Sequence, residues 1–157
     1  MDDATYVAVS EAQMPMFFRI AYSILRNRHD AEDAVQQALL NAWKSRDRAR
    51  PGAERAWMTR IVVNECRNIQ RSRRRCLPVP DFPEEAAPSA QENDTGLYDA
   101  IRALPEKLRT PLLLKYMEGM SEKETAAALG LPLSSVKNRL FRARNILKKT
   151  LREEVAR

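Results

Sequence analysis

The sequence predicts an all-α protein made of two small helical domains joined by a flexible linker. Apolar residues recur at helical spacing, no run alternates with period two for long, and the 157 residues include only four glycines. An acidic, Pro-rich segment at residues 77–96 interrupts the helical pattern. We therefore expect domains at residues 1–76 and 97–157, with residues 77–96 as the linker.

The charge of the chain is distributed in three blocks. Residues 1–77 hold 14 basic and 9 acidic side chains, and residues 78–99 hold 6 acidic and no basic ones. Residues 100–157 hold 13 basic and 6 acidic side chains. Two basic blocks on either side of an acidic one indicate a polyanionic partner that meets both ends of the molecule.

The first domain should contain a short helix from about Thr5 to Ala12 and a longer one from Pro15 to about Arg26. Asp30 is expected to cap a helix that ends at Lys44, and a polar loop precedes a helix over residues 54–75. The expected inner stripe of the helix that Asp30 caps is mostly small, which favours close packing: Ala31, Ala34, Val35, Ala38, Ala42 and Trp43.

Two faces in this domain carry chemistry. On the helix at 54–75, an aromatic, two amides and two guanidiniums share one row, and two further arginines lie near it: Trp57, Asn64, Asn68, Arg71 and Arg75, with Arg73 and Arg74. Amides and guanidiniums recognise bases and phosphates, and aromatics stack on unpaired bases. The alternatives are a core role for Trp57 and a solvated helix end for residues 71–75.

The helix capped by Asp30 shows a different outward row. It contains Asp33, Gln37, either Leu40 or Asn41, and Lys44. An acidic, partly apolar face on a basic domain indicates a surface for a protein partner. The alternative is that Asp30, Glu32 and Asp33 only complement the helix dipole.

In the second domain, residues 97–104 should form a short helix closed by Pro105. Residues 106–118 also look helical, with a kink at Pro111 and with Tyr116 and Met117 facing inward.

A helix-turn-helix follows. Ser121 and Glu124 have the spacing of a capping box, Gly130 can end that helix in the left-handed conformation, and Pro132 starts another. The second helix has an apolar stripe, Val136, Leu140, Ala143, Leu147 and Leu151, and an outer face that holds Lys137, Asn138, Phe141, Arg142, Asn145 and Lys149. This pattern suits insertion into a major groove, and the alternative is a solvated basic helix.

Several functional classes are disfavoured. The start of the chain has no signal-peptide pattern, and no apolar run is long enough to span a membrane. Cys66 and Cys76 are too few for a disulfide framework, and with His29 they do not make a zinc site. We find no catalytic constellation. We expect a cytoplasmic protein, not an enzyme, with no cofactor or metal.

Together these segments resemble the extracytoplasmic-function group of bacterial RNA polymerase sigma factors, which join a region 2 domain to a region 4 domain. The resemblance covers roughly residues 6–76 and 97–151. In the first domain it rests on AYSILRNRHDAEDAVQQALLNAWK and AWMTRIVVNECRNIQRSRRR, and in the second on ALPEKLRTPLLLKYMEGMSEKETAAALGLPLSSVKNRLFRARNILK.

The resemblance implies promoter-specific initiation by core RNA polymerase, bound through its β′ clamp helices and β flap, and control by an anti-sigma factor. It implies that the β′ clamp helices meet Asp30, Glu32, Asp33 and Gln37. The melted −10 element would contact Trp57, Asn64, Asn68, Arg71, Arg73, Arg74 and Arg75. The duplex −35 element would contact Ser134, Ser135, Lys137, Asn138, Arg139, Phe141 and Arg142.

Two other functions are weighed against this one. A sigma-like decoy that binds an anti-sigma protein would not need the basic faces at 71–75 and 137–142. A helix-turn-helix repressor or recombinase accessory would leave the first domain and its acidic row unexplained.

Overall fold

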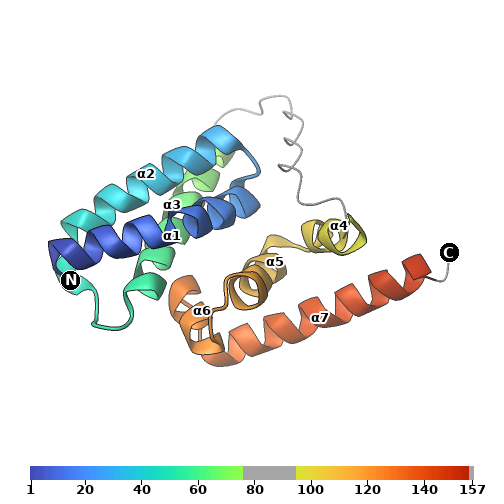
Figure 1. Cartoon of the computed structure of the whole chain (residues 1–157). Coiled ribbons are helices and arrows are strands. Elements are labelled where there is room, and N and C mark those ends of the chain that lie inside the picture. Colours follow the sequence, from blue (N-terminus) through green and yellow to red (C-terminus); the bar gives the residue numbers. More distant parts are fainter. Residues whose placement is uncertain (76–94, 156–157) are drawn as a thin grey trace.

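The computed structural model describes residues 1–75 and 95–155, and these residues form helices and no strand (Figure 1). The all-α prediction is confirmed. The helices are α1 (Asp3–Leu25), α2 (Arg28–Lys44), α3 (Glu54–Arg75), α4 (Thr95–Ala103), α5 (Glu106–Leu112), α6 (Glu122–Leu129) and α7 (Leu133–Val155). A 3₁₀ turn, Arg46–Arg48, follows α2, and a π-helical turn, Leu113–Met117, follows α5.

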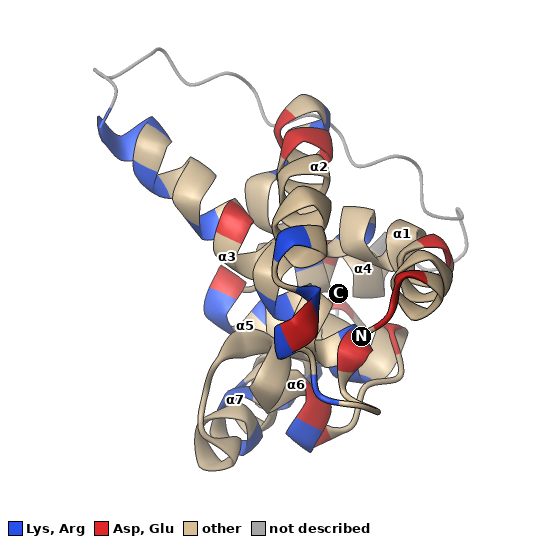
Figure 2. Cartoon of the chain, turned by 90° about the vertical axis from the view of Figure 1, so that its left-hand side faces the viewer, with Lys and Arg blue, Asp and Glu red and all other residues tan. Residues whose placement is uncertain are grey.

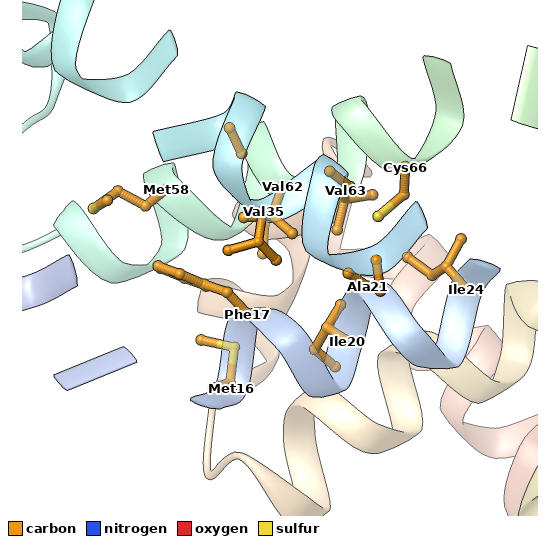
Figure 3. Packing of buried hydrophobic residues seen from close by; sticks show 14 of the residues in the cluster. Met16, Phe17, Ile20, Ala21, Ile24, Val35, Met58, Val62, Val63 and Cys66 are labelled. Atoms are coloured by element: carbon orange, nitrogen blue, oxygen red, sulfur yellow. The ribbon is translucent and has the colours of Figure 1, made fainter. Parts of the chain in front are cut away.

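Helices α1, α2 and α3 form the first bundle, and α1 supplies its largest core side chains (Figure 3). Phe17 and Ile20 are almost completely buried, and Met58 of α3 lies at one end of this core. The side chains that α2 contributes are small, mainly Ala31, Ala34 and Ala38. Small residues let helix axes approach closely, as the sequence predicted.

Two local predictions about this bundle are wrong. The structure has one continuous α1, which passes through Pro15 instead of ending before it. Pro15 is exposed, so water can hydrate the carbonyl that loses its backbone donor there. Asn27, not Asp30, caps α2, because the Asn27 side chain accepts a hydrogen bond of 2.9 Å from the Asp30 amide.

The second unit packs α4 and α5 against α7 around a separate core that includes Leu108, Val136 and Leu140. Its helix-turn-helix was predicted correctly. Ser121 and Glu124 make both hydrogen bonds of a capping box, and Gly130 ends α6 at a φ of 65°.

Pro111 does not break its helix, and the irregularity appears just after it. Pro111 lies inside α5, and the Glu118 amide donates to the Leu113 carbonyl oxygen at 3.1 Å to close the π-helical turn. A π turn holds one more residue than an α turn, so the side chains within it leave the positions that a continuous α-helix would give them. Tyr116 and Met117 are therefore about half exposed, at 54% and 48%, and the prediction that they face inward is wrong.

The two units pack against each other, α3 against α6 and α1 against α5. Residues of the second unit, among them Leu114, Met120 and Leu129, join the buried cluster of the first. The sequence predicted that a flexible linker at residues 77–96 joins these units. Residues 77–94 of that linker lie outside the described residues, as does Cys76.

Ion pairs border this apolar contact. The Arg19 guanidinium donates twice to the Glu118 carboxylate, at 2.7 Å each, and Arg55 Nη2 donates to Glu124 Oε2 at 3.0 Å. The hydrogen bond to Glu118 is the main cause that raises the pKa of Arg19.

Arg109 joins the units from inside. Its side chain is buried, its Nη1 donates to the carbonyl oxygens of Arg102 and Leu104, and its Nη2 donates to Ser23 O at 2.6 Å. The last turn of α1 is therefore bonded to a side chain of α5.

Candidate functional site

The outward face of α2 combines carboxylates with exposed apolar groups. Glu32, Asp33 and Gln37 are exposed, and Leu40 is 56% exposed beside them. Asp33 Oδ2 lies 3.4 Å from His29 Nε2, and Gln37 donates to Asn41 at 3.0 Å. The predicted acidic and apolar row is thus continuous along the helix.

Trp43 extends this face, although the sequence analysis placed it in the inner stripe. The residue is 38% exposed, and its ring packs edge-on against Tyr6 with centroids 5.0 Å apart. The Arg46 guanidinium lies over the ring, 3.8 Å from its centroid. The sequence pattern does not decide this position, because a residue at the edge of an apolar stripe can face either the core or the solvent.

Asp30 does not lie free in this row. It makes an ion pair with Arg73 of α3, and Arg73 Nη1 also donates to the Leu25 carbonyl oxygen at 3.3 Å. One residue expected to face the polymerase is thereby paired with one expected to face DNA.

The other residues predicted on α3 mostly share an exposed face. Asn64, Asn68, Arg71 and Arg75 are exposed, and Arg71 Nη1 lies 3.5 Å from Asn68 Oδ1. Figure 2 shows Lys and Arg at the far end of α3 and Asp and Glu at the start of α2. The acidic row and the basic row lie on different helices, and the Asp30–Arg73 ion pair joins them at this end of the bundle.

Two members of the α3 set lie elsewhere. Trp57 is half-buried and packs against the core of the first bundle, which is the core role that the sequence offered as an alternative, and part of its side chain stays accessible. Arg74 lines a cavity between the two units.

Helix α7 presents the predicted recognition face. Lys137, Asn138 and Arg142 are exposed, and Phe141 is 58% exposed at the same level of the helix. Opposite them, Val136, Leu140 and Ala143 are completely buried, which fixes the rotation of the helix. This face can contact the floor of a major groove.

The start of α7 divides the remaining predicted residues. Ser134 is exposed, Ser135 is half-buried, and both lie in the first turn, where hydroxyl groups can reach a phosphate. Arg139 is half-buried and lines the same cavity as Arg74, on the side of α7 that faces α3.

The carboxylates of α6 are paired with cations. Hydrogen bonds from Lys115 and Arg55, respectively, are the main causes that lower the pKa of Glu122 and of Glu124. Both therefore stay ionised at neutral pH. Their partners offset negative charge that would otherwise lie close to the recognition helix.

Within residues 1–75 and 95–155, no three His, Cys, Asp or Glu side chains gather as metal ligands would. None of the described helices is both long and apolar enough to cross a membrane. Burial raises the pKa of the Cys66 thiol to about 12.

Comparison with known proteins matches each of the two units to a family. Residues 10–76 match the family described as Sigma-70 region 2, and residues 95–147 match Sigma-70, region 4. The ECF RNA polymerase sigma-E factor of Escherichia coli strain K12 is 30% identical over 137 residues, which cover 75% of this chain and 72% of that protein.

Two further relatives extend the comparison. The ECF RNA polymerase sigma factor SigE of Mycolicibacterium smegmatis is 30% identical over 143 residues, and the match covers 83% of this chain but 55% of that protein. The sigma factor RpoE from Bartonella quintana, solved in complex with the anti-sigma factor NepR, superposes with a TM-score of 0.74 at 26% identity. That match covers 91% of this chain and 94% of RpoE.

Proposed function

The chain belongs to the extracytoplasmic-function group of RNA polymerase sigma factors, and on that premise we propose that it directs core polymerase to a specific class of promoters. The observation that carries the proposal is the separation of three outward faces: acidic and apolar on α2, basic on α3 and on α7. Each has the chemistry that one partner requires. The chain supplies recognition, the polymerase supplies catalysis, and the expected compartment is the cytoplasm.

The α2 face is assigned to the β′ clamp helices. Glu32, Asp33 and Gln37 would make the polar contacts, and Leu40 with Trp43 would fill apolar contacts beside them. Asp30 would act indirectly, by holding α2 against α3 through Arg73. The β flap is assigned to the second unit.

The two basic faces are assigned to promoter DNA. On α3, Asn64, Asn68, Arg71 and Arg75 would hold the opened −10 strand, with Trp57 at the near end of the row. On α7, Lys137, Asn138, Phe141 and Arg142 would contact base edges of the −35 duplex, and Ser134 and Ser135 its backbone.

The packed arrangement cannot contact both promoter elements at once. Their centres are separated by roughly 25 base pairs, which is about 85 Å at about 3.4 Å per base pair. A compact chain of this length has a radius of gyration of about 15 Å, and so a diameter near 40 Å. We therefore assign the packed arrangement to the free protein and expect the units to separate on the polymerase.

An anti-sigma factor is proposed as the regulator. RpoE, the solved relative from Bartonella quintana, is held in a complex with NepR, and this chain superposes on it over most of its length. Such a partner would keep the two units of this chain from reaching polymerase and promoter together.

Run-off transcription tests the proposal. Purified chain and core polymerase are incubated with a library in which the −35 and −10 regions are randomised, and transcripts are sequenced. We expect a defined pair of motifs to be enriched only when both proteins are present. If the transcribed promoters show the same −35 and −10 sequences with and without the chain, the proposal is refuted.

A further inference from the structure

A cavity of about 310 Å³ lies between the two units, and both contribute to it. Its apolar lining includes Ile24 and Val63 from the first bundle and Leu129 from α6. Pockets that bind small molecules begin at about this volume and combine apolar walls with a few polar groups. The cavity is thus large enough to hold a ligand and is built for one with an apolar part.

Four cations also line the cavity. Arg67 and Arg74 come from α3, Lys107 from α5 and Arg139 from α7. None of them makes a hydrogen bond or an ion pair with another part of the described chain. The single carboxylate in the lining, Glu106, accepts a hydrogen bond of 2.9 Å from Gln70.

A buried hydroxyl points to a ligand independently of these charges. Thr110 lines the cavity, is 4% exposed, and its Oγ1 has no hydrogen-bond partner among the described residues. A buried polar atom without a partner is costly, and most such atoms are satisfied by protein, water or ligand. A ligand in the cavity would supply the missing partner.

We propose that this cavity binds a nucleoside di- or triphosphate. The base would lie against the apolar lining near Ile24 and Leu129, and the phosphates would be bound by Arg67, Arg74, Lys107 and Arg139. Two or more phosphates are needed because the cations outnumber the carboxylate by four to one. Thr110 would hydrogen-bond a polar group of the ligand.

Binding would favour the packed arrangement of the chain. Arg67 and Arg74 belong to the first unit and Lys107 and Arg139 to the second, so closure brings like charges together. An anion that binds all four cations removes this repulsion. Because all four cations meet only when the units are packed, binding shifts the equilibrium toward the packed arrangement. The family resemblance also implies DNA contacts for Arg74 and Arg139, so a nucleotide and the promoter would compete for these two side chains.

Isothermal titration calorimetry on the full chain tests the proposal. ATP, GTP, pyrophosphate and adenosine are titrated separately without magnesium. We expect ATP or GTP to bind with a dissociation constant below about 1 mM, at least tenfold more tightly than pyrophosphate or adenosine alone. Weaker binding of both nucleotides would overturn the proposal, and pyrophosphate that binds as tightly as either would overturn the role of the apolar wall.

Variants locate the binding site. Arg67→Ala and Lys107→Ala should each weaken nucleotide binding about tenfold, and Thr110→Val about threefold to tenfold. Lys123→Ala removes an exposed charge from α6 outside the cavity and should change affinity less than twofold. Equal losses in Lys107→Ala and Lys123→Ala would show diffuse charge attraction and refute the site.

A last variant tests the requirement for both units. Arg19→Glu places a carboxylate opposite Glu118, outside the cavity, and should drive the units apart. We expect nucleotide binding to weaken at least threefold. Unchanged affinity would contradict a site shared between the units.

Discussion

Asp30 and Arg73 show how single side chains connect the surfaces of this protein. Their ion pair joins the start of α2 to the last turn of α3, so the helix proposed to meet polymerase and the helix proposed to meet DNA are held together at one end. Asp30 is more than half-buried and Arg73 is 43% exposed at the side chain, so the pair is only partly screened by solvent. We expect the exposed side chains around this pair on α2 and α3 to contact polymerase and DNA.

Asp33 is the best single position at which to test the polymerase contact. It is exposed on α2, and His29 of the same helix is its one ion-pair partner among the described residues, so Asp33→Arg should leave folding intact. Reversing a charge at a polar interface should weaken core-polymerase binding by about 2 kcal/mol or more. Fluorescence anisotropy with labelled chain measures this, and Glu11→Arg on α1 is the matched control. Equal affinity for the Asp33 variant and the wild type would remove Asp33 from the interface.

Arg142 and Lys149 should differ in what they recognise. Arg142 projects beside Asn138 from the middle of the recognition face, and a guanidinium binds guanine through two hydrogen bonds. Arg142→Ala should cost about 1–3 kcal/mol and relax the preference at one −35 position. Lys149→Ala should weaken all sequences about equally and reduce the salt dependence. A matrix of −35 variants at two salt concentrations separates these outcomes, and a uniform loss in Arg142→Ala would make it a phosphate contact.

At the scale of helices, local sequence determines the ends of α6 more directly than those of α2 or α5. The Ser121 capping box and Gly130 act within a few residues, so they were predictable from sequence. Asn27 was missed because Asp30 offers the same chemistry three residues later. The exposure of Tyr116 depends on the π turn, which has no simple sequence signal.

The same distinction applies to the candidate site. Periodicity of 100° per residue is enough to predict that Lys137, Asn138 and Arg142 lie on one exposed face of α7. It cannot predict that Arg139 turns toward α3, because that depends on how the second unit packs on the first.

Gly130 should be needed for its backbone conformation. Its φ of 65° is unfavourable for residues with a Cβ, and the Arg60 side chain lies 3.2 Å from where that Cβ would be. We expect Gly130→Ala to lower the free energy of unfolding by about 1–2 kcal/mol, and Gly130→Asn to lower it less. Urea denaturation measures both. Gly52→Ala at a φ of 84°, with nothing within 4 Å, is the control for backbone strain alone. Gly130→Ala as stable as wild type would contradict this.

At the scale of the whole molecule, the contact between the units mixes apolar burial with charge. Leu114, Met120 and Leu129 join the core of the first bundle, while Arg19 and Arg55 reach across to Glu118 and Glu124. Such a contact holds the units together and remains sensitive to salt and to protonation.

Acid should weaken this contact. A hydrogen bond from Arg55 is the main cause that lowers the pKa of Glu124 below its ordinary value of 4.5. Its stabilisation is therefore present above pH 4.5 and is lost as the pH falls through the lowered pKa. The contribution of Glu124 to the free energy of unfolding should be constant from pH 7 to 5 and should decline below pH 4.5.

The Arg55→Met variant isolates that contribution. It removes the hydrogen bond to Glu124, so the decline below pH 4.5 should be shallower than in wild type. Arg48→Met, an exposed arginine in the 3₁₀ turn, is the control and should decline as wild type does. Parallel curves for Arg55→Met and wild type would show that the pair contributes nothing.

The bonds that Arg109 makes to three carbonyl oxygens have a consequence for the proposed separation of the two units. A guanidinium is satisfied by water as well as by carbonyl groups, so the parted surfaces need not adhere to other proteins as bare apolar surfaces would. A shifted docking pose would leave a buried cation without acceptors, which is strongly unfavourable. Arg109 thus limits aggregation when the two units are separated, and it favours one alignment when they dock again.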